Sequence, residues 1–490
     1  MSPYTYSVVS CSTRREFLRG SGFLAATVAL ASCAPSPAAP AATTAPAAEA
    51  TQAPAAEVEA TQAPAATEAP PPTSVPAAEQ IAMRMAFWDA WALDAYEHEA
   101  ELFHELNPNV TVAIEMTSFG EYNQKLTAAM AGGVPPDIAG VVNLFFTSMA
   151  SLGSLLPLDP YIEGEKYDLS DFLDGNLKDG TWRGPLLALP FTADGLWWFY
   201  NQDVFEKEGL ETPYDLWKAG KWNWDTYLDL AKKLTKGEGL EKQWGTESID
   251  PSYDFKFYPL IWENGGDLFD SEYTKCIMNE DKAVQAYQFA YDCRQYAPRP
   301  EDAQVGTHES GKVIMFAEWE LYNTLYVGQV PFKWGCAPPP ASPNTDATVF
   351  CGDAPGWSIP KGVKYANTSW EWIKFLATPE SLTRLFHAIA APPPRVSMFA
   401  TPDIFANHPK YDLDSQVAWE ITQARMKSFK NTPKISTYSE MKTAMSQEMS
   451  LVWADTQGLA EGIEKVTQAW TDLLAGAETD PDVGCAGQFC

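Results

Sequence analysis

The chain has 490 residues and a formal net charge of −30, from 64 acidic and 34 basic residues. This excess of carboxylates argues against a nucleic-acid-binding protein, because such binding depends on contacts of lysine and arginine with phosphate. It also argues against adhesion of the protein surface to an anionic membrane. We therefore expect no nucleic acid among the partners, and no membrane contact through the folded surface.

The first 33 residues have the features of an export signal. Arg14 and Arg15 precede a ten-residue apolar run, GFLAATVALA, which is about half as long as a membrane-spanning helix. The paired arginines indicate the twin-arginine route. The run ends in LASC, which resembles the lipobox of bacterial lipoproteins and implies diacylation of the Cys33 thiol. The alternative is an ordinary signal peptide that is cut near Cys33 and carries no lipid.

Residues 34–79 consist almost entirely of Ala, Pro, Thr and Glu, with the near-repeat EATQAPAAEVEATQAPAATEA. This segment has no large apolar side chains to bury, so we expect it to be a disordered tether. Together with a lipid on Cys33, it predicts an exported protein. We expect the protein to be held at the outer face of the cytoplasmic membrane, in the periplasm or at the cell surface.

Six cysteines follow the signal, and an oxidising compartment favours disulfides among them. A bridge is predicted between Cys336 and Cys351, which flank a loop between two expected short strands. Cys485 and Cys490 are the second candidate pair and would close a small loop in the C-terminal tail. Neither CxxC nor HExxH spacing occurs in the sequence, so no metal and no cofactor are expected.

From residue 82 the chain alternates between strand and helix patterns. Strands are expected over 83–88, 110–116 and 137–142, and helices over 94–108 and 119–133. This order implies parallel strands joined by helical crossovers. Further helices are expected over 222–236, 281–297 and 369–386, and mostly helical patterns fill the last hundred residues. The sequence therefore predicts an α/β protein with more than one core.

Motifs of known catalytic sites are absent from the sequence, which contains no Walker loop, GxGxxG, GxSxG or EF-hand pattern. The carboxylate pair Glu318 and Glu320 is interpreted as solvated surface, since 64 acidic residues make such pairs common. The five histidines are interpreted as ordinary surface or core residues. Nothing in these patterns requires an enzyme.

A series of motifs spans nearly all of residues 82–475. In order, they are FWDAW, LNPNVTVAIE, YNQKLTAAMAGGVPPDIAGV, LALPFTADGLWWFYNQDVFEKEGL, GKWNWDTYLDLAKKL, FYPLIWENGGDLFD, SGKVIMFAEWELY, GDAPGWSIPKG and ATPESLTRLF. This ordered set closely resembles the family 1 extracellular solute-binding proteins of ABC importers, the group of maltose-binding protein. The resemblance implies a two-lobed, type II periplasmic-binding-protein fold with hinge strands and an interlobe ligand cleft.

The resemblance also implies how the chain is divided. Lobe 1 is expected to comprise residues 80–191 and 358–395, and lobe 2 residues 192–357 and 396–476, followed by a tail over 477–490. The implied function is capture of a sugar or oligosaccharide by a monomer that delivers it to ABC permease subunits and is not an enzyme. The alternatives are a binding protein for a non-sugar solute and a surface carbohydrate-active enzyme.

Ligand-binding positions are carried over from the family residue by residue. Asp194 matches an acidic ligand residue on the hinge strand, and Trp319 matches a sugar-stacking tryptophan, although Ala-Glu precedes it in place of the usual Gly-Pro. The other matched positions are Asp89, Trp91, Asn143, Phe255, Tyr258 and Trp357. Aromatic rings and polar groups suit a pyranose, which has apolar faces and a rim of hydroxyls.

Trp197 and Trp198 are adjacent on the expected hinge strand, so their side chains must point to opposite faces. Alternation from Asp194 places Trp198 on the face of that carboxylate. We therefore expect Trp198 to face the cleft and Trp197 to pack in the hinge core, unless a bend in the strand exchanges them.

Overall fold

The computed structural model describes residues 79–88, 90–302, 306–320, 330–345, 347–353, 356–390, 392–409 and 413–486. They belong to one compact unit, which begins at residue 76. The predicted signal over 1–33 and, except for Glu79, the predicted tether over 34–79 lie outside the described residues. Within the described part of the chain, no helix is long and apolar enough to cross a membrane.

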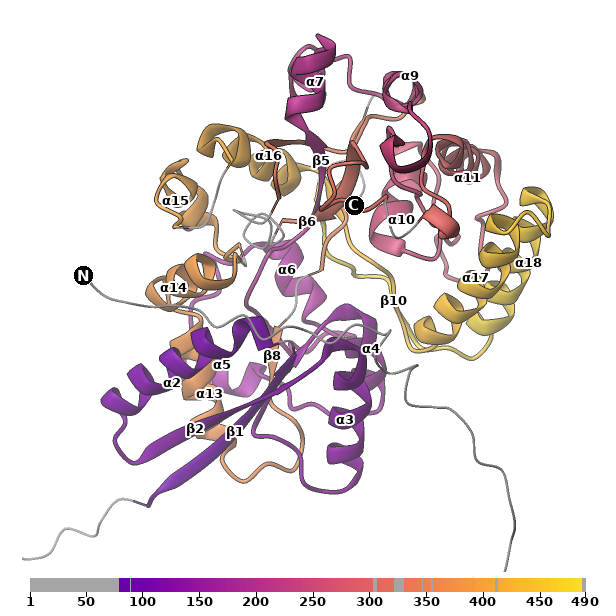
Figure 1. Ribbon diagram of the computed structural model, residues 1–490. Coiled ribbons are helices and arrows are strands. Elements are labelled where there is room, and N and C mark those ends of the chain that lie inside the picture. Colours follow the sequence, from indigo (N-terminus) through magenta and orange to yellow (C-terminus); the bar gives the residue numbers. More distant parts are fainter. Residues whose placement is uncertain are drawn as a thin grey trace, which may run out of the picture. The chain divides into compact units, whose positions relative to one another are not determined.

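A five-stranded sheet carries the first part of the unit (Figure 1). Its strands, in spatial order, are β2 (Val110–Thr117), β1 (Ile81–Trp88), β3 (Ile138–Val141), β8 (Gly356–Ser358) and β4 (Leu189–Pro190). The first three run parallel, as predicted, and β8 is antiparallel to both of its neighbours. Burial alternates along β1, where Met83, Met85 and Phe87 are buried, and this explains the strand pattern in the sequence.

A second, antiparallel sheet has three strands. They are β6 (Met315–Trp319), β5 (Leu196–Asn201) and β7 (Trp334–Ala337), with β5 in the middle. Two smaller pairs join β10 (Lys434–Ile435) to β11 (Thr479–Asp480) and β12 (Cys485–Ala486) to β9 (Phe429–Lys430). All six residues of β5 are buried, because both faces of this sheet are covered.

The helices surround the two sheets. They are α2 (Leu93–Leu106), α3 (Phe119–Ala131), α4 (Asn143–Ser151), α5 (Asp159–Glu165), α6 (Asp174–Asp179), α7 (Gln202–Glu208), α8 (Pro213–Lys218), α9 (Trp224–Leu234), α10 (Asp254–Glu263), α11 (Asp281–Cys293), α13 (Ala366–Leu376), α14 (Pro379–Ile389), α15 (Asp403–Ala406), α16 (Ser415–Lys427), α17 (Tyr438–Trp453) and α18 (Leu459–Leu474). Short 3-10 helices cover Ala90–Ala92, Gly239–Glu241, Arg294–Tyr296, Pro300–Asp302 and Val396–Phe399. The helices predicted in the first half of the chain are confirmed within a few residues.

The single helix predicted over 369–386 is wrong, because the chain forms two helices, α13 and α14. The break lies at Thr378, whose side-chain oxygen accepts a hydrogen bond from the Ser381 amide at 3.3 Å. Pro379 occupies the first position of α14, where a missing amide proton costs nothing. The Thr-Pro pair is a start signal for a new helix that the apolar periodicity obscured.

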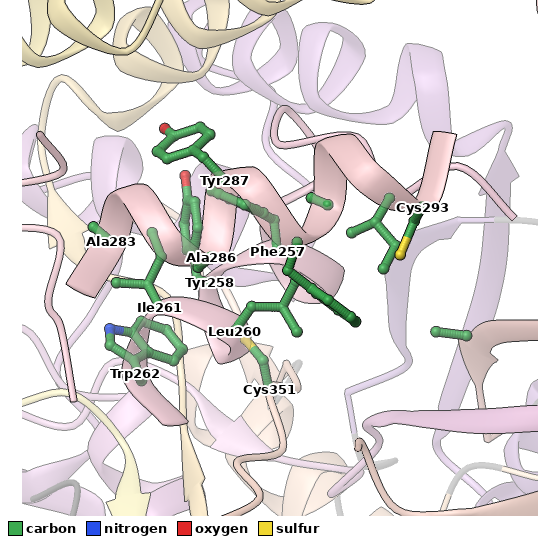
Figure 2. Close-up of a cluster of buried hydrophobic side chains, with 14 of the residues drawn as sticks. Phe257, Tyr258, Leu260, Ile261, Trp262, Ala283, Ala286, Tyr287, Cys293 and Cys351 are labelled. Atoms are coloured by element: carbon green, nitrogen blue, oxygen red, sulfur yellow. The ribbon is translucent and has the colours of Figure 1, made fainter. Parts of the chain in front are cut away.

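Three hydrophobic clusters form the core. One fills the five-stranded sheet and its helices, while the other two lie on opposite faces of the three-stranded sheet. Figure 2 shows part of the largest cluster, in which side chains of α10 and α11 interlock. The prediction of more than one core is therefore confirmed.

The chain passes between the two sheets at three neighbouring places. Residues 191–195 connect β4 to β5, and Gly352 and Asp353 lie between β7 and β8 in the chain. Gly195 forms a bridge with Gly352. The third connection follows α14 and contains Pro392, whose carbonyl accepts a hydrogen bond from the Ala193 amide at 2.7 Å. Asp194 lies at the first of these crossings, between β4 and β5.

The C-terminal segment lies near the same crossings. Within it, β11 pairs with β10, and β12 pairs with β9. On its other side, the Gly484 amide donates to Asp179 Oδ1 of α6 at 3.0 Å, and Asp480 Oδ2 accepts from the Arg183 amide at 2.7 Å. Residues 479–486 are thus hydrogen-bonded both to the region of α6 and to the strands beside the second sheet.

The predicted bridge between Cys336 and Cys351 is wrong, because both thiols are free and buried. Cys336 lies on β7 beside Phe199, in the cluster on one face of the three-stranded sheet. Cys351 belongs to the cluster on the opposite face (Figure 2). The sheet separates the two sulfurs. Cys485 is disulfide-bonded; Cys490 lies outside the described residues, so the pairing of these two cysteines remains a prediction.

The buried thiols give a first testable prediction. Burial raises the pKa of Cys336 and of Cys351 well above the ordinary value, so their reactive thiolates are scarce. We expect iodoacetamide to label both after denaturation in guanidinium and neither in the folded protein. Mass mapping of the labelled peptides measures this, and one crosslinked peptide that contains both cysteines would contradict the fold described here.

Candidate functional site

Trp197 and Trp198 do point to opposite faces of β5, but neither opens onto a cleft. Trp197 is 0% exposed and packs with Phe199 and Phe316 on one face. Trp198 is 2% exposed and lies with Tyr200 in the cluster on the other face. The expectation that Trp198 faces the ligand is therefore corrected. Both tryptophans are core residues, because helices or loops cover each side of the three-stranded sheet.

Asp194 lies at the crossing between the sheets, within a buried group of charges. Its Oδ1 accepts a hydrogen bond from the Gly195 amide at 2.8 Å. Arg425 of α16 reaches the same place, with its Nη2 3.7 Å from the Oε2 of Glu320. Burial raises the pKa of Asp194 well above its usual range, and the charge of Glu320 adds to this, while Arg425 acts in the opposite direction.

A small cavity adjoins the Asp194 carboxylate. Its volume is about 30 Å³, which suits bound water and is too small for a sugar ring. Its polar lining residues are Asn176, Asp194, Asp353, Arg425 and Asn431. Asn176 lies on α6, Asp194 and Asp353 lie at two of the crossings, Arg425 lies on α16, and Asn431 directly follows β9. The cavity therefore lies where the two sheets and their helices meet.

The raised pKa of Asp194 predicts a pH-dependent effect of the substitution Asp194→Asn. The folded protein binds this proton more tightly than the unfolded chain, so the stabilisation is complete below pH 3.8 and is lost as the pH rises through the folded-state pKa. Asparagine keeps the acceptor for Gly195 without a charge. We therefore expect the variant to gain stability over the wild type by up to about 1.4 kcal/mol for each pH unit in that window. Urea unfolding at pH 3.5 and at pH 7.5 measures this gain, and an equal difference at both would contradict it.

Three half-buried aromatic residues form what we call the Trp319 platform: Tyr253, Phe255 and Trp319. The Trp319 indole Nε1 donates to the Tyr253 hydroxyl at 2.9 Å. The Phe255 ring meets the Trp319 ring edge-on, with centroids 4.8 Å apart. These contacts fix the Trp319 ring while part of it stays accessible. The predicted pair of Phe255 and Trp319 is thus brought together, and Tyr253 is a member that the sequence did not identify.

A group of buried charges supports this platform from behind. Lys256 Nζ lies 2.7 Å from Glu247 and 3.9 Å from Glu318, and the His308 ring lies 3.5 Å and 3.8 Å from the same two carboxylates. Burial acts to raise the pKa of Glu247, but the cations outweigh it and lower the value to about 2. The interpretation of Glu318 and Glu320 as solvated surface is therefore wrong, because their side chains are 16% and 0% exposed.

A polar groove lies between Ser252, which precedes Tyr253 of the platform in the chain, and the exposed face of α17. We call it the α17 groove; its volume is about 520 Å³. Its lining residues are Ser252, Ser439, Lys442, Thr443, Ser446, Gln447 and Ser450. Lys442 Nζ donates to the Ser252 carbonyl at 2.7 Å and pairs with Asp254 at 2.7 Å, so α17 is held against the segment that carries Tyr253.

The α17 groove was not predicted from the sequence, although the sequence contains a pattern that indicates it. Ser439, Thr443, Ser446 and Ser450 recur at intervals of three and four residues, which places them along one face of a helix. The opposite face carries a buried row of methionines. A row of hydroxyl side chains on one helix is therefore the pattern that marks this groove. The helix also contacts α4, which begins at the predicted site residue Asn143.

The remaining predicted ligand residues do not reach the groove or are not described. Tyr258 is 0% exposed and lies in the core between α10 and α11 (Figure 2), so its predicted contact with ligand is corrected. Trp357 is also 0% exposed and packs on Phe191 in the five-stranded sheet. Asp89 and the side chains of Trp91 and Asn143 lie outside the described residues.

Comparison with known proteins gives the arrangement a family. The family described as bacterial extracellular solute-binding protein matches residues 80–382. The chain belongs to this family. A binding protein of Brucella abortus shares 24% identity with this solute-binding protein over 309 residues, which cover 61% of this chain and 72% of the relative. The sn-glycerol-3-phosphate-binding periplasmic protein UgpB of Pectobacterium atrosepticum shares 21% over 431 residues, or 81% and 93% of the two chains.

Solved structures share the fold of this solute-binding protein. A Listeria monocytogenes ABC substrate-binding protein in complex with cycloalternan has a TM-score of 0.70 at 19% identity and covers 81% of this chain and all of its own. Maltose-bound MalE3 of T. maritima has a TM-score of 0.67 at 19% identity, over 80% and 100%. The predicted two-lobed α/β fold is thereby confirmed.

Proposed function

We propose that this solute-binding protein serves an ABC importer and that its solute is a carbohydrate, held in the α17 groove against the Trp319 platform. The observation that carries the proposal is the platform itself, a fixed and partly exposed indole. The row of hydroxyl side chains along the α17 groove supports it. An indole covers the apolar face of a pyranose, while hydroxyl and ammonium groups satisfy its rim. The saccharides bound by the Listeria and T. maritima proteins of similar fold support the same class.

The lobe assignment belongs to this proposal. Residues 80–191 and 358–395 would form one lobe, and residues 192–357 and 396–476 the other, with 477–490 as a tail. The three crossings between the sheets support such a division, because each passes from one hydrophobic cluster to another. Asp194, at one of these crossings, lines a cavity too small for a sugar ring and is not part of the proposed binding groove.

Thermal-shift measurements over a panel of mono- and oligosaccharides test the proposal, followed by calorimetry on every compound that shifts the melting temperature. Ligand at 100 times its dissociation constant stabilises a protein by about 2.7 kcal/mol, so a true ligand gives a clear signal. Chromatography of each incubated saccharide reports cleavage, which would indicate a carbohydrate-active enzyme instead. A panel without any shift would reject the carbohydrate.

A phosphate ester is the second candidate, favoured by the glycerol-3-phosphate-binding relative. Its charge would need a cation in the groove, and Lys442 already pairs with Asp254 there. The same thermal-shift panel includes sn-glycerol-3-phosphate. A shift with this compound and with no saccharide would favour the phosphate ester.

We further propose that a lipid on Cys33 holds the protein at the outer face of the cytoplasmic membrane, where it meets the permease. Cys33→Ala is expected to move the exported protein from the membrane fraction to the soluble fraction, because the acyl chains are the proposed anchor. Immunoblots of fractionated cells measure this. Replacing Arg14 and Arg15 by lysine serves as the control for the export route and is expected to block export. Retention of Cys33→Ala through a carbonate wash would reject the lipid anchor.

A further inference from the structure

A second cavity continues the α17 groove toward the C-terminal end of α17. Its volume is about 720 Å³, and we call it the distal pocket. It is lined by Ser248, Asp250, Arg294, Arg299, Ser450, Trp453 and Asp455, with Pro298, Pro300, Gly306 and Ala454. Ser450 lines both cavities, and the loop over residues 248–252 contributes to a wall of each. The two cavities therefore follow one helix in series.

The distal pocket contains a fixed aromatic ring of its own. Trp453 Nε1 donates to the Ser248 hydroxyl at 3.0 Å. The Arg294 guanidinium lies over the Tyr291 and Trp453 rings, at 4.5 Å and 5.4 Å from their centroids, and donates to the Trp453 carbonyl at 2.9 Å. A ring held in this way loses little conformational entropy when a ligand covers it. The pocket is thus preorganised for an aromatic contact.

The charges of the pocket balance one another. Arg294 and Arg299 both face Asp455, at 3.0 Å and 3.6 Å, and Asp250 adds a second carboxylate to the lining. Two cations and two anions leave no net charge to select an anionic or cationic ligand. They do supply donors and acceptors for hydroxyl groups. This chemistry fits an uncharged, hydroxyl-rich compound.

We propose that the distal pocket is a binding subsite for the far end of a linear, uncharged oligosaccharide whose near end lies in the α17 groove. The proposal rests on the carbohydrate function proposed above and adds the length of the ligand. From Ser439 to Trp453, α17 spans about 21 Å at about 1.5 Å per residue, several times the width of one sugar ring. A monosaccharide or disaccharide leaves the distal pocket empty.

Calorimetry of the mature chain tests this with ladders of one to six units: glucose units linked α-1,4 or β-1,4, xylose and mannose units linked β-1,4, and arabinose units linked α-1,5. In the series that binds, the wild-type affinity is expected to rise by about tenfold or more beyond the disaccharide, the effect of one aromatic contact. Trp453→Ala is expected to remove this gain and leave disaccharide affinity unchanged.

Arg299→Ala is the second variant, because the Arg299 side chain is 61% exposed and its removal spares the fold. It is expected to lower hexasaccharide affinity by several-fold without changing disaccharide affinity. Lys125→Ala, at a site 63% exposed on α3, is the matched control and should change neither.

The outcomes separate the two proposals. Affinity that does not depend on chain length, or an equal loss for short and long ligands in Trp453→Ala, overturns the distal subsite and leaves the carbohydrate function standing. Failure of every ladder to bind the wild type at any length overturns both.

Discussion

Trp319→Ala is expected to weaken binding of the saccharide that shifts the wild-type melting temperature most by about 30- to 100-fold. The indole is the central surface of the Trp319 platform, and covering about 100 Å² of it at about 25 cal/mol per Å² is worth about 2.5 kcal/mol. The loss should appear in the calorimetric dissociation constant, with little change in the melting temperature of the unliganded protein, because Trp319 is only half-buried.

Two further substitutions sharpen this test. Trp319→Phe keeps an aromatic face and should retain most of the affinity. Tyr253→Phe removes the hydroxyl that holds the indole and should produce an intermediate loss. Trp217→Ala, in a half-buried tryptophan of α8 that lines neither cavity, is the matched control. If Trp319→Ala binds with wild-type affinity, the platform is not part of the binding site.

Arg425→Met is expected to lower the free energy of unfolding by about 3–5 kcal/mol, the usual cost of removing one partner from a buried ion pair. Arg425 is 5% exposed, and its guanidinium faces the buried carboxylates of Asp194 and Glu320. Methionine fills a similar space, so the loss reports mainly the two charges left without this cation. Urea unfolding at pH 7.5 measures it.

The pH dependence separates this explanation from poor packing. Without Arg425 the pKa of Asp194 rises further, so the loss should be smaller at pH 4 than at pH 7.5. The double variant Arg425→Met with Glu320→Gln should recover part of the stability, because one buried charge is then removed. Lys125→Met, in an exposed ion pair with Glu121 on α3, is the control and should cost about 1 kcal/mol or less. If Arg425→Met also costs only about 1 kcal/mol, the buried charges do not depend on Arg425 as described here.

Local patterns predicted the first sheet well. The strands at β1 to β3 and the helices between them are encoded by apolar periodicity within short windows, so their order and parallel pairing followed directly. The crossing at Asp194 and the aromatic pair of Phe255 and Trp319 came from the ordered motifs of the family. These features depend on neighbours in the sequence or on a shared motif order.

Other features depend on residues that are distant in the sequence. Trp198 is buried because α9 and α10 cover its face of β5, and alternation along a strand says nothing about such cover. Glu320 meets Arg425 across more than one hundred residues, so its burial could not be predicted from its own surroundings. Cys336 and Cys351 are close in the sequence, yet a sheet separates their side chains.

The C-terminal segment has a mechanical consequence. Its hydrogen bonds reach Asp179 on α6 and, through β11 and β12, the strands beside the second sheet. Any rotation of one lobe against the other must lengthen or bend these connections, so residues 479–486 restrain such a rotation from outside the proposed binding groove. Substitutions in this segment would therefore change how readily the protein opens and how fast a solute enters and leaves, while the groups that recognise the solute stay the same.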